Sequence, residues 1–367
     1  MLKIKYSLAL TSLSLLVIAG LVSSIPKSIS DKDIKIGALL CLSGDCAEWG
    51  TNTLRGMELA VKEVNQQGGV DGRKLKIIAE DSREDSPVNV ISAYRNLTLL
   101  KKVKYIVGPT WTPASYALAP VAKKDKAILI SPTVGAKEFN ETSENLFNIW
   151  PHDDDSTRYL ARYAFSSGIR KISVLTSQQP WESAQGLAFR DEFIRLGGQV
   201  LIYRELIPTE TNFRTEVQKL LVGHPDGVFL GNLSHMAQAA RILRELNFDG
   251  KKFTPLMDQT RLDAALGAFE DTIFIRHQQE EKFFTEKFIQ AFGMQPGLGA
   301  DKGYDAVKLF VLAFEKESPL TSFEVQEKLR NISKYSGASG SITFNEKRAV
   351  ERAPILWKVS QGSFVKL

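Results

Sequence analysis

The sequence contains few of the residues that build metal sites and nucleophilic active sites. Only two of its 367 residues are cysteine and four are histidine, whereas metal sites need such ligands at set spacings. The histidines are scattered, at His152, His224, His235 and His277. The chain also lacks the G-x-S-x-G and H-E-x-x-H motifs that position catalytic groups in hydrolases and metalloproteases. We therefore expect neither an enzyme nor a bound metal or cofactor.

Long hydrophobic runs are also scarce. The single long one lies at residues 8–22, after Lys3 and Lys5, and is followed by Ser23 and Ser24. A positive end, a short apolar core and small residues are typical of a secretory signal peptide, which we expect to span residues 1–24. A membrane span needs about 20 apolar residues, so an uncleaved N-terminal anchor is the alternative. The leader predicts export to the periplasm.

The chain has little net charge. The formal charge of +5 includes Lys3 and Lys5, so the chain without its leader carries +5 − 2 = +3. A charge so small and so evenly spread argues against nucleic acid as a partner. The roughly 340 residues that follow the leader are too many for one hydrophobic core, so we expect two domains.

The first segment after the leader is typical of a strand, helix and strand in sequence. Residues 34–40 form a short apolar run, which fits a parallel strand buried on both faces. Residues 52–65 carry apolar side chains at helical spacing and end at Gly68 and Gly69, where glycine favours a left-handed cap. A second strand is expected at residues 75–79. Parallel units place ligands at the carboxyl ends of their strands, which here is the loop LSGDCAEWG.

Both cysteines, Cys41 and Cys46, belong to this loop region. In an oxidising compartment two cysteines without a third are expected to form a disulfide. Closing so small a ring stabilises the fold by about 2 kcal/mol in the chain-entropy model. A metal or redox pair is the alternative. We expect the disulfide to stiffen a ligand-binding loop.

Strands and helices continue to alternate, in two series. The first series continues with a strand at 105–107, a helix at 113–124 and a strand at 128–130. The second begins after Trp150 and Pro151, with helices at 155–166, 181–196, 213–221 and 236–246 and strands at 171–176, 199–206, 228–230, 253–257 and 272–276. The C-terminal part is expected to form helices near 281–292, 302–315 and 322–329 and strands near 341–344, 354–359 and 363–365.

Six strings in this order resemble one known family. They are DIKIGALL, LSGDCAEWG, ELAVKEVNQQGGVDGRKLKI, YIVGPTWTPAS, AILISPTVG and GSITFNEK. The resemblance is to periplasmic solute-binding proteins of the leucine/isoleucine/valine-binding type, the extracellular receptor ligand-binding family. It implies an α/β fold of two doubly wound, Rossmann-like lobes joined by three crossovers, the type I periplasmic-binding fold. The first lobe is then expected to comprise 33–152 plus 277–333, and the second 153–276 plus 334–367.

The resemblance also implies a function. The lobes are expected to close around an amino acid, or a related small zwitterion or amide, and the protein, expected to be a monomer, to deliver it to an ABC permease in the membrane. The alternative is a periplasmic sensory or regulatory subunit that acts on a membrane partner protein.

The segment from Gly108 to Pro113 is a candidate anion site. Threonine is common at the N-cap of a helix, and proline is common at the first helical position. Thr112 and Pro113 therefore fit the start of a helix. Backbone N–H groups at such a helix start bind anions, and the resemblance implies that the α-carboxylate of an amino acid lies there. Thr112 as a simple cap is the alternative.

Other candidates follow from the resemblance and from their places after strands. The loop with Ser131, Thr133 and Gly135 resembles the family's second loop for the carboxylate and amine, but Gly135 stands where amino-acid binders have a hydroxyl residue. Three aromatic residues are expected to wall the cleft: Trp49, Trp111 and Trp181.

The second lobe supplies polar candidates as well. Asn232 follows the strand at 228–230, and Gln259 stands where amino-acid binders have a glutamate for the ligand's ammonium group. Its neighbour Asp258 is a candidate ammonium partner, with a helix or turn cap as the alternative. The run Asp153, Asp154 and Asp155 is expected to cap the helix that follows it.

Overall fold

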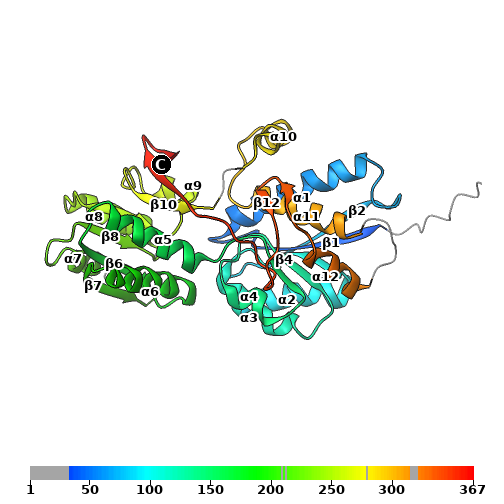
Figure 1. The fold of residues 1–367 in the computed structure, drawn as a ribbon, viewed down its shortest axis with the longest axis horizontal. Helices are drawn as coiled ribbons and strands as arrows, with labels where there is room; N and C mark the ends of the chain where they lie inside the picture. Colours follow the sequence, from blue (N-terminus) through cyan, green and yellow to red (C-terminus); the bar gives the residue numbers. More distant parts are fainter. Residues whose placement is uncertain (1–32, 208–209, 211–212, 278–279, 315–320) are drawn as a thin grey trace, which may run out of the picture.

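The computed structural model describes residues 33–207, 210, 213–277, 280–314 and 321–367, so the expected signal peptide at 1–24 lies outside the described residues. The chain folds into two α/β lobes, each built on its own sheet (Figure 1). Within the described residues, no helix is both long and apolar enough to cross a membrane.

The sheet of the first lobe is entirely parallel, in the order β2-β1-β3-β4-β5. Its strands are β1 (Ile34–Leu40), β2 (Leu75–Asp81), β3 (Tyr105–Val107), β4 (Ile128–Ser131) and β5 (Leu146–Asn148). Its helices are α1 (Ala47–Gln66), α2 (Pro87–Arg95) with the π-helical turn η1 (Asn96–Leu100), α3 (Thr112–Ala122) and α4 (Lys137–Thr142). Because every connection is a parallel crossover, the loops after β1, β3 and β4 emerge at one edge of the sheet.

Three later helices complete the first lobe: α10 (Lys282–Phe292), α11 (Ala300–Phe314) and α12 (Ser322–Arg330). Helix α11 packs closely on α1 because two glycines remove the side chains between them. A Cβ at Gly56 would lie 1.8 Å from the carbonyl oxygen of Ala300, and one at Gly303 would lie 2.2 Å from that of Thr53. Because neither glycine has a side chain, the backbones of α1 and α11 pack directly against each other, which fixes the position of α1.

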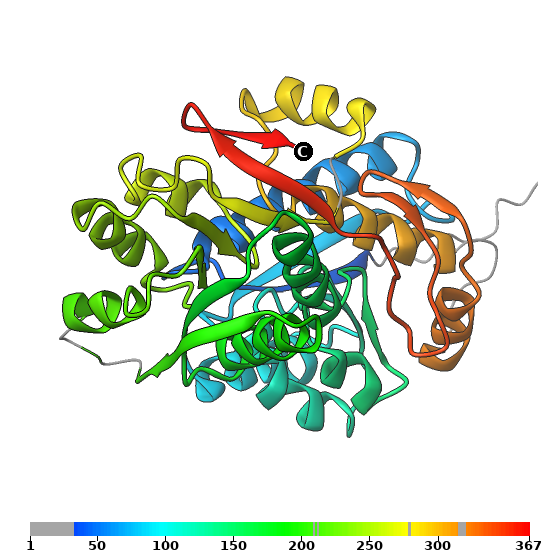
Figure 2. The same cartoon turned by 60° about the vertical axis from the view of Figure 1, so that its left-hand side comes forward.

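The sheet of the second lobe has the order β14-β13-β10-β9-β8-β6-β7. Its strands are β6 (Lys171–Ser177), β7 (Gln199–Leu206), β8 (Gly227–Leu230), β9 (Lys251–Thr254), β10 (Ile273–Arg276), β13 (Ile355–Ser360) and β14 (Ser363–Lys366). The first five are parallel, and β13 and β14 form an antiparallel hairpin at the edge, drawn in red in Figure 2. The helices are α5 (Asp153–Ser166), α6 (Pro180–Arg195), α7 (Phe213–Leu220), α8 (Met236–Glu245) and α9 (Gln259–Ala264).

The last crossover from the first lobe to the second lies later in the chain than residue 333, where the first lobe was expected to end. Strands β11 (Tyr335–Gly337) and β12 (Gly340–Ile342) form a separate two-stranded sheet. Ala338, Ile342, Phe344 and Val350 belong to the same core as Phe147 in β5. The chain therefore leaves the first lobe between Val350 and the start of β13.

Most expected elements are present, with different ends. The expected strands at 34–40, 105–107 and 199–206 are confirmed residue by residue. The strand expected at 253–257 is wrong in position, because β9 ends at Thr254 and Pro255, which has no N–H group, cannot continue the ladder. Helices α2, α4 and α9 and strands β5 and β11 were not expected.

Candidate functional site

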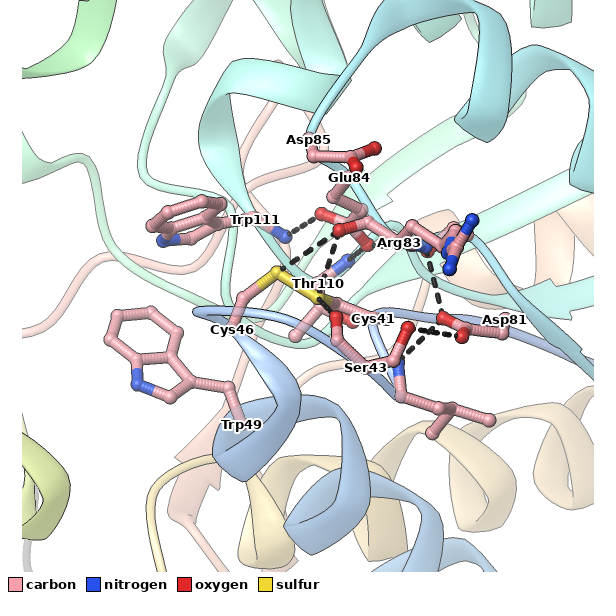
Figure 3. Close-up of a disulfide and its surroundings, with 12 residues drawn as sticks. Cys41, Ser43, Cys46, Trp49, Asp81, Arg83, Glu84, Asp85, Thr110 and Trp111 are labelled. Atoms are coloured by element: carbon pink, nitrogen blue, oxygen red, sulfur yellow. Dashed lines mark hydrogen bonds between the residues drawn. A yellow bond between two sulfur atoms is a disulfide. The ribbon is translucent and has the colours of Figure 1, made fainter. Parts of the chain in front are cut away.

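Cys41, after β1, and Cys46, before α1, form a disulfide with a Cα–Cα distance of 5.7 Å, which confirms the sequence prediction. Both residues are buried. The intervening loop is also tied to β2, because Asp81 accepts hydrogen bonds from the Leu42 N–H (2.9 Å) and the Ser43 hydroxyl (2.6 Å). These bonds fix the loop from which α1 starts (Figure 3).

The first turn of α1 reaches across to the second lobe. The indole Nε1 of Trp49 donates to Oδ2 of Asp258 at 2.9 Å. The neighbouring Glu48 accepts from the backbone N–H of Thr260 at 3.0 Å and from its hydroxyl group. These contacts join the two lobes directly, so the structure is a closed form.

Four of the chain's five tryptophans line one cavity between the lobes. We call it the tryptophan cavity, and its lining is Trp49, Trp111, Thr112, Pro113, Thr133, Trp150, Asp153, Trp181, Leu233 and Leu256. The rings of Trp49 and Trp150 stack with their centroids 6.4 Å apart. The cavity volume is about 10 Å³, which is close to the least that one water molecule needs. A solute can therefore enter only if the lobes or the indole rings move.

Asp153, the first residue of α5, supplies the carboxylate of the tryptophan cavity. Its Oδ1 accepts from Nε1 of Trp150 at 2.8 Å, and its Oδ2 accepts from Nε1 of Trp181 at 2.7 Å. Nε2 of His277 lies 3.6 Å from Oδ1. Burial lowers the pKa of His277, so this ring is neutral at neutral pH. Asp153 was expected only as a cap, but the N-cap of α5 is His152.

The expected capping role of Thr112 is wrong. The N-cap of α3 is Trp111, in an extended conformation, and its side chain makes no capping hydrogen bond. The Thr112 hydroxyl instead accepts from the N–H of Gly135 at 2.9 Å. This bond joins the segment after β3 to the loop after β4. The Thr112 side chain therefore connects two segments and does not cap its own helix.

The two backbone N–H groups directly before α3 are also engaged. The carboxylate of Glu84 accepts from the N–H of Thr110 at 2.9 Å and from that of Trp111 (Figure 3). Ser82 donates to the same carboxylate at 2.9 Å. Burial raises the pKa of Glu84 to about 7 against these hydrogen bonds. Sequence reasoning missed Glu84, although its place after β2 is a signal that a carboxylate lies at the ligand edge.

The three candidates at the end of β4 and in the loop after it are Ser131, Thr133 and Gly135, and each contacts different groups. Thr133 lines the tryptophan cavity and donates its hydroxyl to the carbonyl oxygen of Thr110. Ser131 is fully buried, donates to the carbonyl oxygen of Pro109 at 3.0 Å and accepts from the N–H of Val134. A Cβ on Gly135 would lie 1.5 Å from Oδ2 of Asp153. The Asp153 carboxylate thus occupies the space that a side chain at position 135 would need.

The candidates from the second lobe lie outside the tryptophan cavity. Asp258 caps α9 by accepting from the N–H of Arg261 at 2.8 Å and forms an ion pair with the same arginine. Gln259 is exposed and donates to Asp263 at 2.8 Å. Both line a neighbouring groove of about 850 Å³. The amide of Asn232 is buried, with no hydrogen-bond partner among the described residues.

Comparison with known proteins identifies the family. The family described as "Periplasmic binding protein" matches residues 33–362. The chain belongs to this family. Its resemblance to the leucine/isoleucine/valine-binding type is thereby confirmed, and members of the family bind solutes and are not enzymes.

Among curated relatives, the chain is 24% identical over 223 residues to the Leu/Ile/Val-binding protein of Citrobacter freundii, with 60% of each chain covered. The chain thus spans less than two thirds of the length of that protein. A longer match, 23% identical over 329 residues, covers 86% of this periplasmic binding protein and 87% of the Leu/Ile/Val-binding protein homolog 1 of Brucella suis.

Solved structures share the fold. A leucine-binding protein LivK from Thermotoga maritima superposes with a TM-score of 0.83 at 20% identity, covering 91% of this chain and 97% of its own. LivJ from Streptococcus pneumoniae in complex with isoleucine gives 0.83 at 21% identity, with coverage of 92% and 100%. A solute-binding protein from R. palustris in complex with benzoate gives 0.80 at 19% identity, with coverage of 92% and 96%. The two-lobe α/β fold predicted from the sequence is thereby confirmed.

Proposed function

We propose that this exported protein is the substrate-binding component of an ABC-type importer. It encloses a small nitrogen-bearing organic solute, of the size of an amino acid, between its lobes and delivers it as a monomer to a membrane permease. Membership of the periplasmic binding protein family and the names of the relatives, which are Leu/Ile/Val-binding proteins, support this role.

One observation carries the proposal. Four of five tryptophans meet around a single cavity, and they come from both lobes. In the first lobe, Trp49 lies in the first turn of α1, after β1, and Trp111 directly precedes α3, after β3. In the second lobe, Trp181 lies in the first turn of α6, after β6. Loops at the carboxyl ends of parallel strands are where such folds bind ligands. Aromatic rings give a small solute a large contact area.

Binding by closure follows from the contacts between the lobes. Opening the cleft must break the bond from Trp49 to Asp258 and those from Thr260 to Glu48. A solute that touches both lobes stabilises the closed form by its additional contacts. We propose that Trp49, Trp111, Thr112, Thr133 and Trp181 touch the solute. Ser131, Gly135, Asn232, Asp258 and Gln259 stay predictions as solute contacts.

A screen of solutes tests the proposed function. The full exported chain is mixed with branched amino acids, their amines, amides and small aromatic acids, and thermal unfolding is measured. A solute at 100 times its dissociation constant should stabilise the protein by about 2.7 kcal/mol. The same solute should shrink the X-ray scattering radius and change tryptophan fluorescence.

Two variants make the screen specific. Trp181→Ala should remove the response to the solute, because it deletes one wall of the tryptophan cavity. Trp357→Phe, a tryptophan on β13 outside that cavity, should keep it. If no solute in the screen changes unfolding, scattering or fluorescence, the proposed function is wrong.

A further inference from the structure

We propose that the solute is an organic ammonium ion without a carboxylate group, held by Asp153 inside the tryptophan cavity. This inference rests on the proposed function and specifies the chemistry of the same site. It follows from the positions of two carboxylates of the chain, those of Glu84 and Asp153.

The two backbone donors directly before α3 are not free for a ligand carboxylate. At the start of α3, where backbone N–H groups would bind an anion, Glu84 accepts from the N–H groups of Thr110 and Trp111 (Figure 3). Glu84 is only 4% exposed and accepts a further hydrogen bond from the Ser82 hydroxyl. A solute carboxylate therefore finds these two donors engaged.

The space beside Gly135, the second candidate place for a ligand carboxylate, is occupied by Asp153. Its carboxylate lies against Gly135, where a Cβ would come within 1.5 Å of Oδ2, and its backbone N–H donates to the carbonyl oxygen of Gly135 at 3.0 Å. The Gly135 N–H is itself bonded to Thr112. A second carboxylate beside Asp153 would meet like-charge repulsion in a site with little water. The cleft is thus unfavourable for an α-amino acid bound through its carboxylate.

Asp153 lacks a cationic partner of its own. Among the described residues no lysine or arginine nitrogen forms an ion pair with it, and the basic group within ion-pair distance is His277, whose Nε2 lies 3.6 Å from Oδ1. His277 is neutral at neutral pH because burial lowers its pKa. The nearby Lys302 is paired with Asp301 at 2.8 Å. A carboxylate has about four acceptor positions. The indoles of Trp150 and Trp181 use two of them, and His277 Nε2 lies 3.6 Å from Oδ1 as a third neighbour.

A cation bound at Asp153 would supply the opposite charge that this buried carboxylate lacks. A buried charge is costly unless it is paired, so an ammonium group gains both the ion pair and the remaining acceptor positions. Trp49 and Trp111 line the same cavity, and aromatic rings can attract cations electrostatically. Leu233 and Leu256 provide an apolar wall for an alkyl group. A branched alkylammonium ion matches all three features.

Three probes with one branched alkyl skeleton test the charge preference by calorimetry on the full exported chain. Isopentylamine carries the ammonium group alone, L-leucine carries both charges, and isocaproate carries the carboxylate alone. We expect isopentylamine to bind about tenfold tighter than leucine or more, and isocaproate to bind weakest.

Removal of the charge of Asp153 tests whether this residue binds the solute. Asp153→Asn keeps the shape of the side chain and should weaken isopentylamine binding about a hundredfold. The matched control is Asp155→Asn, because Asp155 is exposed in the same first helical turn and should leave binding unchanged. Circular dichroism confirms that each variant is folded, and if Asp153→Asn does not fold, the three probes decide alone.

The outcomes separate this inference from the proposed function. Tighter binding of leucine or isocaproate than of isopentylamine overturns the ammonium inference but leaves a solute-binding protein. Undiminished isopentylamine binding by folded Asp153→Asn overturns it too, as does a failure of all three probes to bind. The proposed function itself is refuted only when the wider solute screen yields no binder.

Discussion

Glu84 offers a sharp test of the site geometry, because its carboxylate is buried against two backbone N–H groups at the start of α3. Burial raises its pKa from 4.5 to about 7, although Thr110, Ser82 and Trp111 donate hydrogen bonds to it. We expect replacement of this carboxyl group by an amide, in Glu84→Gln, to change how stability depends on pH.

The direction follows from proton linkage. In the unfolded chain Glu84 loses its proton near pH 4.5, and in the folded protein near pH 7. Between these values the folded state binds more protons, so the free energy of unfolding falls as pH rises. The contribution is fully present below pH 4.5 and lost above pH 7. The shift of 7 − 4.5 = 2.5 corresponds to roughly 3 kcal/mol at 1.36 kcal/mol per pKa unit.

The assay is urea unfolding of the wild type and of Glu84→Gln across this pH range. The difference between the two proteins isolates Glu84, because the other titrating groups are common to both. Relative to the variant, the wild type should lose roughly 3 kcal/mol of stability as pH rises. Glu58→Gln, an exposed site on α1, should keep the wild-type profile. Parallel profiles for wild type and Glu84→Gln would refute the account of Glu84 given above.

Three further outcomes are expected. Replacing Cys41 and Cys46 together by serine should lower the free energy of unfolding by about 2 kcal/mol, measured by urea unfolding without reductant, and free thiols in the purified wild type would contradict the disulfide. Trp49→Phe should cost the closed form about 1 kcal/mol, because the Asp258 carboxylate loses one buried donor; an unchanged scattering radius and unchanged solute affinity would argue against this contact. Gly56→Ala should lower stability by about 1–3 kcal/mol, because the new Cβ would meet the carbonyl oxygen of Ala300 at 1.8 Å, whereas Glu58→Ala on the exposed face of α1 should cost much less; equal thermal stability of the two variants would refute the tight packing of α1 on α11.

The fold was largely predictable from the sequence because its strands are short apolar runs between turn residues. The strand at 34–40 was found at its full length for this reason. Helix α2 was missed although its signal was present. Ser86 precedes Pro87, and its side chain accepts from the N–H of Asn89, as an N-cap before a first-turn proline does.

The site was predictable only in part. Trp49, Trp111 and Trp181 were expected at the cleft because they follow strands, and they do meet there. The register of Thr112 was misjudged because Thr-Pro fits a helix start in two ways, and the choice depends on the distant Gly135 N–H. Glu84 and Asp153 were missed as site residues, because acidic residues after strands and before helices are common as caps. Their burial depends on loops far away in the sequence.

Gly135 and Asp153 together explain how one small residue can change what a cleft accepts. With no side chain at position 135, the carboxylate of Asp153 fills the space, so the fixed charge in the cleft becomes negative. Asp153 also bonds to both lobes, through its N–H to Gly135 in the first and through its carboxylate to Trp181 in the second. A cation held there contacts the crossover and the indole of the second lobe at once. If the solute is the proposed ammonium ion, binding of its charge and closure of the lobes are linked through the same carboxylate. We then expect a neutral solute of equal shape to close the lobes less completely.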